Sequence, residues 1–173
     1  MWQYRGHKRP DFATVPGPGQ ESVWDYPRPP KLASDSRLVE VYSGDQVVVS
    51  SVRTYRVLET ASPLSFYIPP QDVNWGLLVF APGSSVCEWK GATQYWTPFL
   101  QSSRGHRCWS YPDPTLAFEQ IRDYISFYPA AIACYVSGER VRAQSGQFYG
   151  GWITGDIVGP FKGESGNRYS PKE

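Results

Sequence analysis

The chain has 173 residues and a net charge of +1, which fits one domain and gives no overall electrostatic attraction for nucleic acid. Sixteen glycines and sixteen prolines exclude an all-helical bundle, and a hydrophobic content of 40% excludes wholesale disorder. With 12 Tyr, 8 Phe and 7 Trp, the composition favours a β-rich domain packed with aromatic side chains.

Residues 1–36 are rich in proline and aromatic residues. The segments PGPGQ (16–20) and YPRPP (26–30) exclude a regular helix or a central strand, because proline fixes φ and lacks an N–H donor. Two interpretations stay open: a polyproline ligand for a partner, or an ordered arm packed on the domain through Trp24 and Tyr26. We favour the arm, because aromatic residues at this density usually pack.

Several classes of protein are excluded by residues that the sequence lacks. Residues 1–12 contain no apolar segment typical of a secretory signal, and apolar runs such as Leu77 to Ala81 are too short to span a membrane. We therefore expect a cytoplasmic protein without a membrane partner. The three cysteines are far apart, so we expect no disulfide framework, no metal site and no cofactor. His7 lies in the arm and His106 in a Ser/Arg/Gly loop, which argues against a Ser–His–Asp triad.

From residue 37 onward, the pattern predicts short strands. The segments 38–49 and 135–142 each predict a hairpin with a glycine-containing turn. Between them lie apolar pieces of strand length, bounded by Pro, Gly, Ser or Asp: 53–59, 64–68, 75–80, 85–89 and 95–100. We expect a single domain over 37–166 and a polar, frayed tail at 167–173.

One amphipathic helix is predicted over 114–126. Asp113 can cap it, Pro114 suits its first position, and Pro129 would stop it. Apolar residues recur at helical spacing along it and form one stripe: Phe118, Ile121, Ile125 and Tyr128.

The segment 87–91 (CEWKG) is the densest group of candidate catalytic residues. Cys87 is the candidate nucleophile, and the ammonium of Lys90 would stabilise its thiolate if a turn at Gly91 brought the two together. The alternative is that Cys87 is a small buried hydrophobic residue. Glu59 ends a predicted strand, where a partly buried carboxylate suits acid–base catalysis or pairs with Lys90 or an arginine. The residues do not decide between these two roles.

The candidate ligand-binding residues are lysines and aromatic residues. Lys90-Gly91 and Lys162-Gly163 each follow an aromatic residue and can present an ammonium and backbone N–H groups to an anion, although such a lysine usually lies in a solvated turn. Aromatic residues with polar tips near expected element ends are candidates for the walls of a ligand cleft, the alternative being the core: Tyr67, Tyr95, Trp109, Tyr111 and Tyr128.

Five blocks occur in the order and spacing of a known family: RVLET at 56–60, Tyr67-x-Pro69 with Asp72-Val73, Cys87-x-x-Lys90-Gly91 with Tyr95, WSYPDP at 109–114, and Phe127-Tyr128-Pro129. They resemble the bacterial and fungal family of domain of unknown function 427 over about residues 37–142. The flanking segments resemble the longer form common in cyanobacteria.

The resemblance implies a β-tent fold, the architecture of Mss4-like proteins and methionine sulfoxide reductase B, with antiparallel sheets and a single packed helix. Many β-tent proteins hold zinc through two Cys-x-x-Cys pairs. This chain has neither pair, so the resemblance implies no metal here.

Three hypotheses for function follow, in order of preference. The first is a module that binds an unknown small molecule in an aromatic cleft, with Glu59 and Lys90 as polar contacts. The second is an enzyme, either Cys-dependent through Cys87 or nucleotidyltransferase-like, as a label of the family suggests. The third is an interaction or scaffold domain, in which the arm or residues 146–163 dock a partner or a second copy to form a homodimer.

Overall fold

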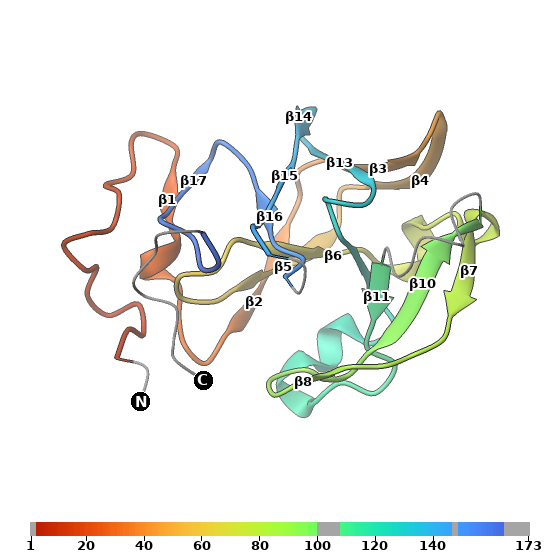
Figure 1. Ribbon diagram of the computed structural model, residues 1–173, viewed down its shortest axis with the longest axis horizontal. Helices are drawn as coiled ribbons and strands as arrows, with labels where there is room; N and C mark the ends of the chain where they lie inside the picture. The colour runs from red at the N-terminus through yellow and green to blue at the C-terminus, as the bar shows by residue number, and fades with distance from the viewer. Residues whose placement is uncertain (1–2, 100–107, 147–148, 165–173) are drawn as a thin grey trace.

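The computed structural model describes residues 3–99, 108–146 and 149–164 (Figure 1). His106, residue 100 of the expected strand 95–100 and the expected tail at 167–173 lie outside these residues. The described chain is mainly β, as the composition predicts, with short, mostly antiparallel strands joined by turns and 3-10 segments. No helix in the described ranges is long and apolar enough to cross a membrane.

Both predicted hairpins are confirmed, and they pair with each other in one sheet. The order is β14 (Glu139–Arg140), β13 (Ala133–Val136), β3 (Val39–Ser43) and β4 (Gln46–Ser51). Ser137 and Gly138 join β13 to β14 with φ angles of 49° and 79°. Positive φ at both central residues is typical of the tight turns that match the twist of a hairpin.

Most of the other expected strands lie in two further sheets. A four-stranded sheet has the order β12 (Ile125–Phe127), β11 (Cys108–Ser110), β10 (Gln94–Pro98) and β7 (Leu78–Ala81). A three-stranded sheet has the order β2 (Lys31–Asp35), β5 (Thr54–Leu58) and β6 (Ser65–Tyr67). Strand β2, inside the proline-rich region, was not predicted, and it occupies the sheet edge where proline-flanked strands are tolerated.

The remaining strands form short pairs, and most of the described helical segments are single 3-10 turns. The pairs are β8 (Val86–Cys87) with β9 (Gly91–Ala92), β15 (Arg142–Ala143) with β16 (Trp152–Ile153), and β1 (Glu21–Ser22) parallel to β17 (Ile157–Val158). The short 3-10 segments are η1 (Val23–Asp25), η2 (Pro70–Asp72) and η3 (Trp75–Leu77).

The predicted helix over 114–126 forms only as a short 3-10 segment. A kinked 3-10 segment, η5 (Leu116–Ile121), occupies only its first half, and Thr115 rather than Asp113 is the residue at its cap. Asp123 has a φ of 61°, which ends helical geometry. Ile125 then belongs to β12, where its N–H and C=O bond with those of Ile68 at 3.0 and 2.8 Å. Pairing with β11 and Ile68 therefore outweighs the helical spacing of the apolar residues.

A large apolar core joins these sheets, and the N-terminal segment takes part in it. Trp24 is 1% exposed, and its Nε1 donates a hydrogen bond to the carbonyl of Pro160 at 3.0 Å. The rings of Tyr4 and Phe12 meet the Trp24 ring edge-on at 5.2 and 4.8 Å. Residues near both ends of the described chain therefore complete one core.

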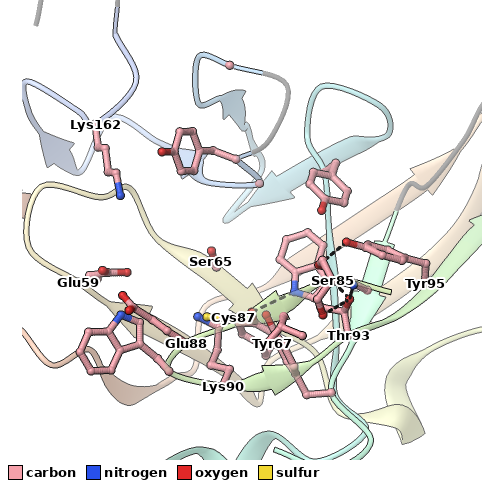
Figure 2. A pocket seen from close by; sticks show the side chains of 18 of the residues that line it. Glu59, Ser65, Tyr67, Ser85, Cys87, Glu88, Lys90, Thr93, Tyr95 and Lys162 are labelled. Atoms are coloured by element: carbon pink, nitrogen blue, oxygen red, sulfur yellow. Dashed lines mark hydrogen bonds between the residues drawn. The ribbon is translucent and has the colours of Figure 1, made fainter. Parts of the chain in front are cut away.

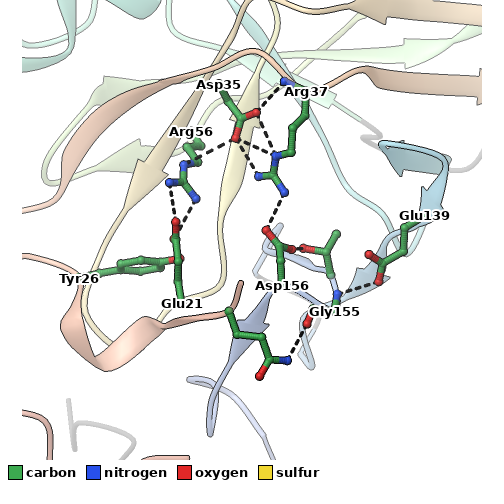
Figure 3. A network of polar contacts seen from close by, with 10 residues as sticks. Glu21, Tyr26, Asp35, Arg37, Arg56, Glu139, Gly155 and Asp156 are labelled. Atoms are coloured by element: carbon green, nitrogen blue, oxygen red, sulfur yellow. Dashed lines mark hydrogen bonds and ion pairs between the residues drawn. The ribbon is translucent and has the colours of Figure 1, made fainter. Parts of the chain in front are cut away.

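A network of ion pairs ties the same segments together at one side of the core (Figure 3). Arg56 on β5 makes two hydrogen bonds to Glu21 at 2.9 and 2.8 Å. Arg37 contacts Asp35 on β2 and reaches Asp156, next to β17, at 2.6 Å. Hydrogen bonds from Arg56 hold the pKa of Glu21 below its ordinary value. The network joins β1, β2, β5 and the chain near β17.

Candidate functional site

A cavity of about 860 Å³ lies beside the apolar core, and residues from widely separated segments line it (Figure 2). The structure brings every candidate side chain from the sequence to this one cavity: Cys87, Glu59, Lys90, Tyr67, Tyr95, Trp109, Tyr111, Tyr128 and Lys162. The volume lies within the range of small-molecule sites, about 300–1,000 Å³.

Strand alternation explains how the same strands face both the core and the cavity. On β6, Tyr67 lines the cavity and the preceding Phe66 packs in the large core. On β11, Trp109 lines the cavity and the preceding Cys108 packs in the core. Because successive side chains of a strand point to opposite faces, each of these strands supplies side chains to both environments.

One wall of the cavity is a cluster of rings. Nε1 of Trp109 donates a hydrogen bond to the Tyr67 hydroxyl at 3.1 Å, and the two rings meet edge-on at 6.2 Å. The ring of Tyr128 lies 4.5 Å from that of Trp109. Burial raises the pKa of Tyr67, Tyr111 and Tyr128, so their hydroxyls stay protonated across the physiological range.

Two small polar residues that the sequence did not single out hold Tyr95 in place. The Tyr95 hydroxyl lies 2.6 Å from Ser85 Oγ, which in turn lies 3.1 Å from Thr93 Oγ1. The backbone N–H of Ser85 also donates to Thr93 Oγ1 at 2.8 Å. Both residues line the cavity. Only their position at the base of the β8–β9 hairpin could have indicated them.

A tight turn separates Cys87 from Lys90, as their interaction would require. Cys87 pairs with Gly91 across the β8–β9 hairpin, and Gly91 has a φ of 110°. A Cβ on Gly91 would lie 3.1 Å from the carbonyl of Asp113, so the close approach also favours glycine. Thr115, in the same neighbouring segment, holds the turn, because its N–H donates to the carbonyl of Lys90 at 3.0 Å.

The three cysteines lie in different environments. Cys87 is partly buried against the ring cluster and lines the cavity. Cys108 and Cys134 are fully buried in the core, and burial raises the pKa of both thiols. Cys87 is therefore the cysteine that a molecule in the cavity would meet.

Glu59 forms the arginine ion pair that was one of its two expected roles. Arg28 Nη1 lies 2.7 Å from Glu59 Oε1, and Arg28 Nη2 lies 3.6 Å from Glu88. The guanidinium also lies over the ring of Trp89 at 5.4 Å. Sequence reasoning missed Arg28, whose only signal was its place between the prolines and aromatic residues of YPRPP.

The two lysines of the cavity contact rings rather than carboxylates. Lys90 Nζ lies 5.5 Å from the Phe118 ring and 6.0 Å from the Tyr111 ring, and Lys162 Nζ lies 5.3 Å from the Tyr149 ring. Within the described residues, no carboxylate forms an ion pair with either lysine. Among those residues there is likewise no group of three or more His, Cys, Asp or Glu placed to hold a metal ion.

A comparison with protein-family models tests the resemblance to DUF427 that the five sequence blocks suggested. A family model described as domain of unknown function (DUF427), with the short name NTP_transf_9, matches residues 31–138. The chain belongs to the DUF427 family. No curated protein matches it.

Part of the cavity lies outside the residues that match DUF427. Gly146, Tyr149, Gly150 and Lys162 follow the matched range, and Arg28, the partner of Glu59, precedes it. Gly150 fits closely against the ring cluster, because a Cβ there would lie 2.5 Å from the ring of Trp109. The segment after the matched range therefore lines part of the cavity, and the segment before it supplies the cation that pairs with Glu59.

Proposed function

We propose that this DUF427 protein is a small-molecule-binding module of β-tent architecture, and that the aromatic cavity is its ligand site. One observation carries the proposal: charged, hydroxyl and aromatic side chains from separate strands and turns line the same cavity. An apolar core would bury such groups away from water, whereas ligand sites combine apolar walls with a few polar groups. The volume of about 860 Å³ accommodates a small organic molecule.

A cavity-filling variant with a matched control tests this function. Ser65 lines the cavity from β6, and Ser65→Phe places a ring in it. Ser50→Phe adds the same ring at an exposed position of β4. A library of small planar molecules is screened by ligand-observed NMR against the purified protein. We expect hits that compete with each other, persist in Ser50→Phe and vanish in Ser65→Phe. Hits that bind Ser65→Phe equally well would place the ligand site elsewhere.

A Cys87-dependent enzyme is the second candidate, and the accessibility of the thiol from the cavity favours it. Cys87 shares the cavity with Lys90 and Glu59, while the other two cysteines are buried. The rate of thiol alkylation as a function of pH tests the candidate, with Cys87→Ser as the background. Alkylation at neutral pH supports an activated thiolate. Alkylation that begins only near about pH 8.5, the value of a free thiol, excludes it.

A further inference from the structure

Among the described residues, the carboxylates of the cavity form ion pairs, whereas its two ammonium groups form none. Arg28 Nη1 forms an ion pair with Glu59 Oε1 at 2.7 Å, and Arg28 Nη2 lies 3.6 Å from Glu88 Oε1. The side chain of Glu59 is 19% exposed, so this pair is only partly screened by water. Lys90 and Lys162 line the same cavity and contact only rings through their ammonium groups among the described residues.

This distribution of charge favours one sign of ligand. Glu59 engaged by a guanidinium is a poor partner for a cationic ligand, because binding would require breaking an existing pair. An ammonium group that touches only aromatic faces keeps its hydrogen-bond donors for an incoming oxygen. Figure 2 shows the two lysines reaching the cavity from separate segments, Lys90 from the β8–β9 turn and Lys162 from the chain after β17.

We propose that the ligand is a planar aromatic molecule bearing one anionic oxygen group, a carboxylate or a phosphate, and that Lys90 and Lys162 bind that group. The ring would pack against the wall formed by Tyr67, Trp109 and Tyr128, where aromatic pairs add stacking to apolar burial. This assignment rests on the proposed function, because it names the class of molecule that the cavity takes.

The assignment also gives the flanking segments a role. Lys162 lies after residues 31–138, and Arg28 lies before them. The first supplies a cation to the cavity, and the second neutralises carboxylates that would repel an anion. Charge selectivity in this chain therefore depends on residues outside the part that matches the family.

Three coumarins of similar shape test the proposal by fluorescence titration of the full chain. The probes are 7-methoxy-4-methylcoumarin, which is neutral, 7-methoxycoumarin-4-acetic acid and 4-methylumbelliferyl phosphate. We expect either anion to bind about tenfold or more tightly than the neutral probe, since a charge-assisted hydrogen bond is the added interaction. The affinity for the anion should also fall as salt is raised. The carboxylate and phosphate arms show which anionic group the site prefers.

Lysine variants connect the preference to the two side chains. Lys162→Met and Lys90→Met should each weaken binding of the anion about tenfold and leave the neutral probe unchanged. Lys162→Arg should restore binding of the anion, because it keeps the charge. Lys31→Met, on the exposed face of β2, is the matched control. Unchanged affinity for the neutral probe shows that each variant is folded.

The outcomes separate this assignment from the proposed function. In one outcome, all three probes bind equally, lose binding in Ser65→Phe and show no response to the lysine variants. That result would support the cavity as the ligand site but overturn the proposal that the ligand is anionic. Failure of every probe to bind overturns the anionic aromatic ligand, while the library screen with Ser65→Phe still decides the binding function. Tighter binding of an anion that does not depend on Lys90 or Lys162 overturns the assignment of these two residues.

Discussion

Phe66 and Tyr67 are neighbours on β6, yet they belong to two regions of different construction. Phe66 is fully buried in the large apolar core, 5.1 Å from the ring of Trp152. Tyr67 is 1% exposed but belongs to the ring cluster beside the cavity, and its hydroxyl accepts a hydrogen bond from Trp109. The comparison teaches that one set of strands can carry the apolar core on one face and a ligand-sized cavity on the other.

The apolar core and the cavity also differ in how their charged side chains are partnered. Beside the core, Arg56 and Arg37 are paired with carboxylates from several segments (Figure 3). At the cavity, Arg28 pairs with the lining residue Glu59, but Lys90 and Lys162 contact rings. The first arrangement holds the chain together, and the second is the basis of the proposed anionic ligand.

Deleting residues 1–30 should have the largest effect on this comparison. The deletion removes Trp24 from the core and Glu21 from its pair with Arg56. Loss of a buried Trp side chain alone costs about 3–5 kcal/mol, a large share of the roughly 5–15 kcal/mol that stabilises a domain. We expect circular dichroism to show no cooperative urea transition. A truncated chain that still unfolds cooperatively and loses a co-purified partner would identify a separable interaction arm.

Substitutions at adjacent positions of β6 should have the next largest effects and should differ from each other. Phe66→Ala should lower the free energy of unfolding by about 3–5 kcal/mol, because it leaves a hole in the apolar core. Tyr67→Phe removes only a hydroxyl and leaves Nε1 of Trp109 without its acceptor, which costs about 1–3 kcal/mol. Urea unfolding measures both. Equal losses would contradict the distinction between core face and cavity face.

The smallest expected effect is a change in the pH dependence of stability. The pKa of Glu21 is lowered in the folded protein by hydrogen bonds from Arg56, so its pair stabilises the fold above the unfolded value of about 4.3. That contribution is lost as the pH falls through the lower folded pKa. Glu21→Gln should therefore make the acid side of the stability profile shallower, as measured by urea unfolding between about pH 2 and 7.

Asp45→Asn is the control for this prediction. It removes one carboxyl from the exposed β3–β4 turn, away from the network of Figure 3. A Glu21→Gln profile that keeps the slope of the natural chain would show that the Arg56 pair does not contribute to acid sensitivity.

The strands and hairpins were predictable because their signals are local. Alternating apolar residues and glycine turns predict β3–β4 and β13–β14, and both form. The helix over 114–126 forms only as a short 3-10 segment, because its apolar spacing fits two structures. The partner that decides for a strand at Ile125 is Ile68, which lies far away in the chain. Strand β2 was missed because prolines precede it, although an edge position tolerates them.

The rings, the cysteine and the lysines of the candidate site were predictable, but several other members and the contacts between them were not. The residue types and blocks indicated the rings, Cys87 and the lysines, which line one cavity. Arg28 was missed, because nothing in the sequence states which cation meets Glu59. Ser85 and Thr93 were missed because small hydroxyl residues in turns are common and carry no distinctive pattern.

Taken alone, the sequence determined the β class, the turns and the pool of reactive and aromatic side chains, because each depends on near neighbours in the chain. The tertiary structure alone decided that the chain after residue 138 lines the cavity, and that Arg28 rather than Lys90 pairs with Glu59. The physical reason is that an ion pair or a strand partner is chosen by distance in space, which local periodicity does not encode.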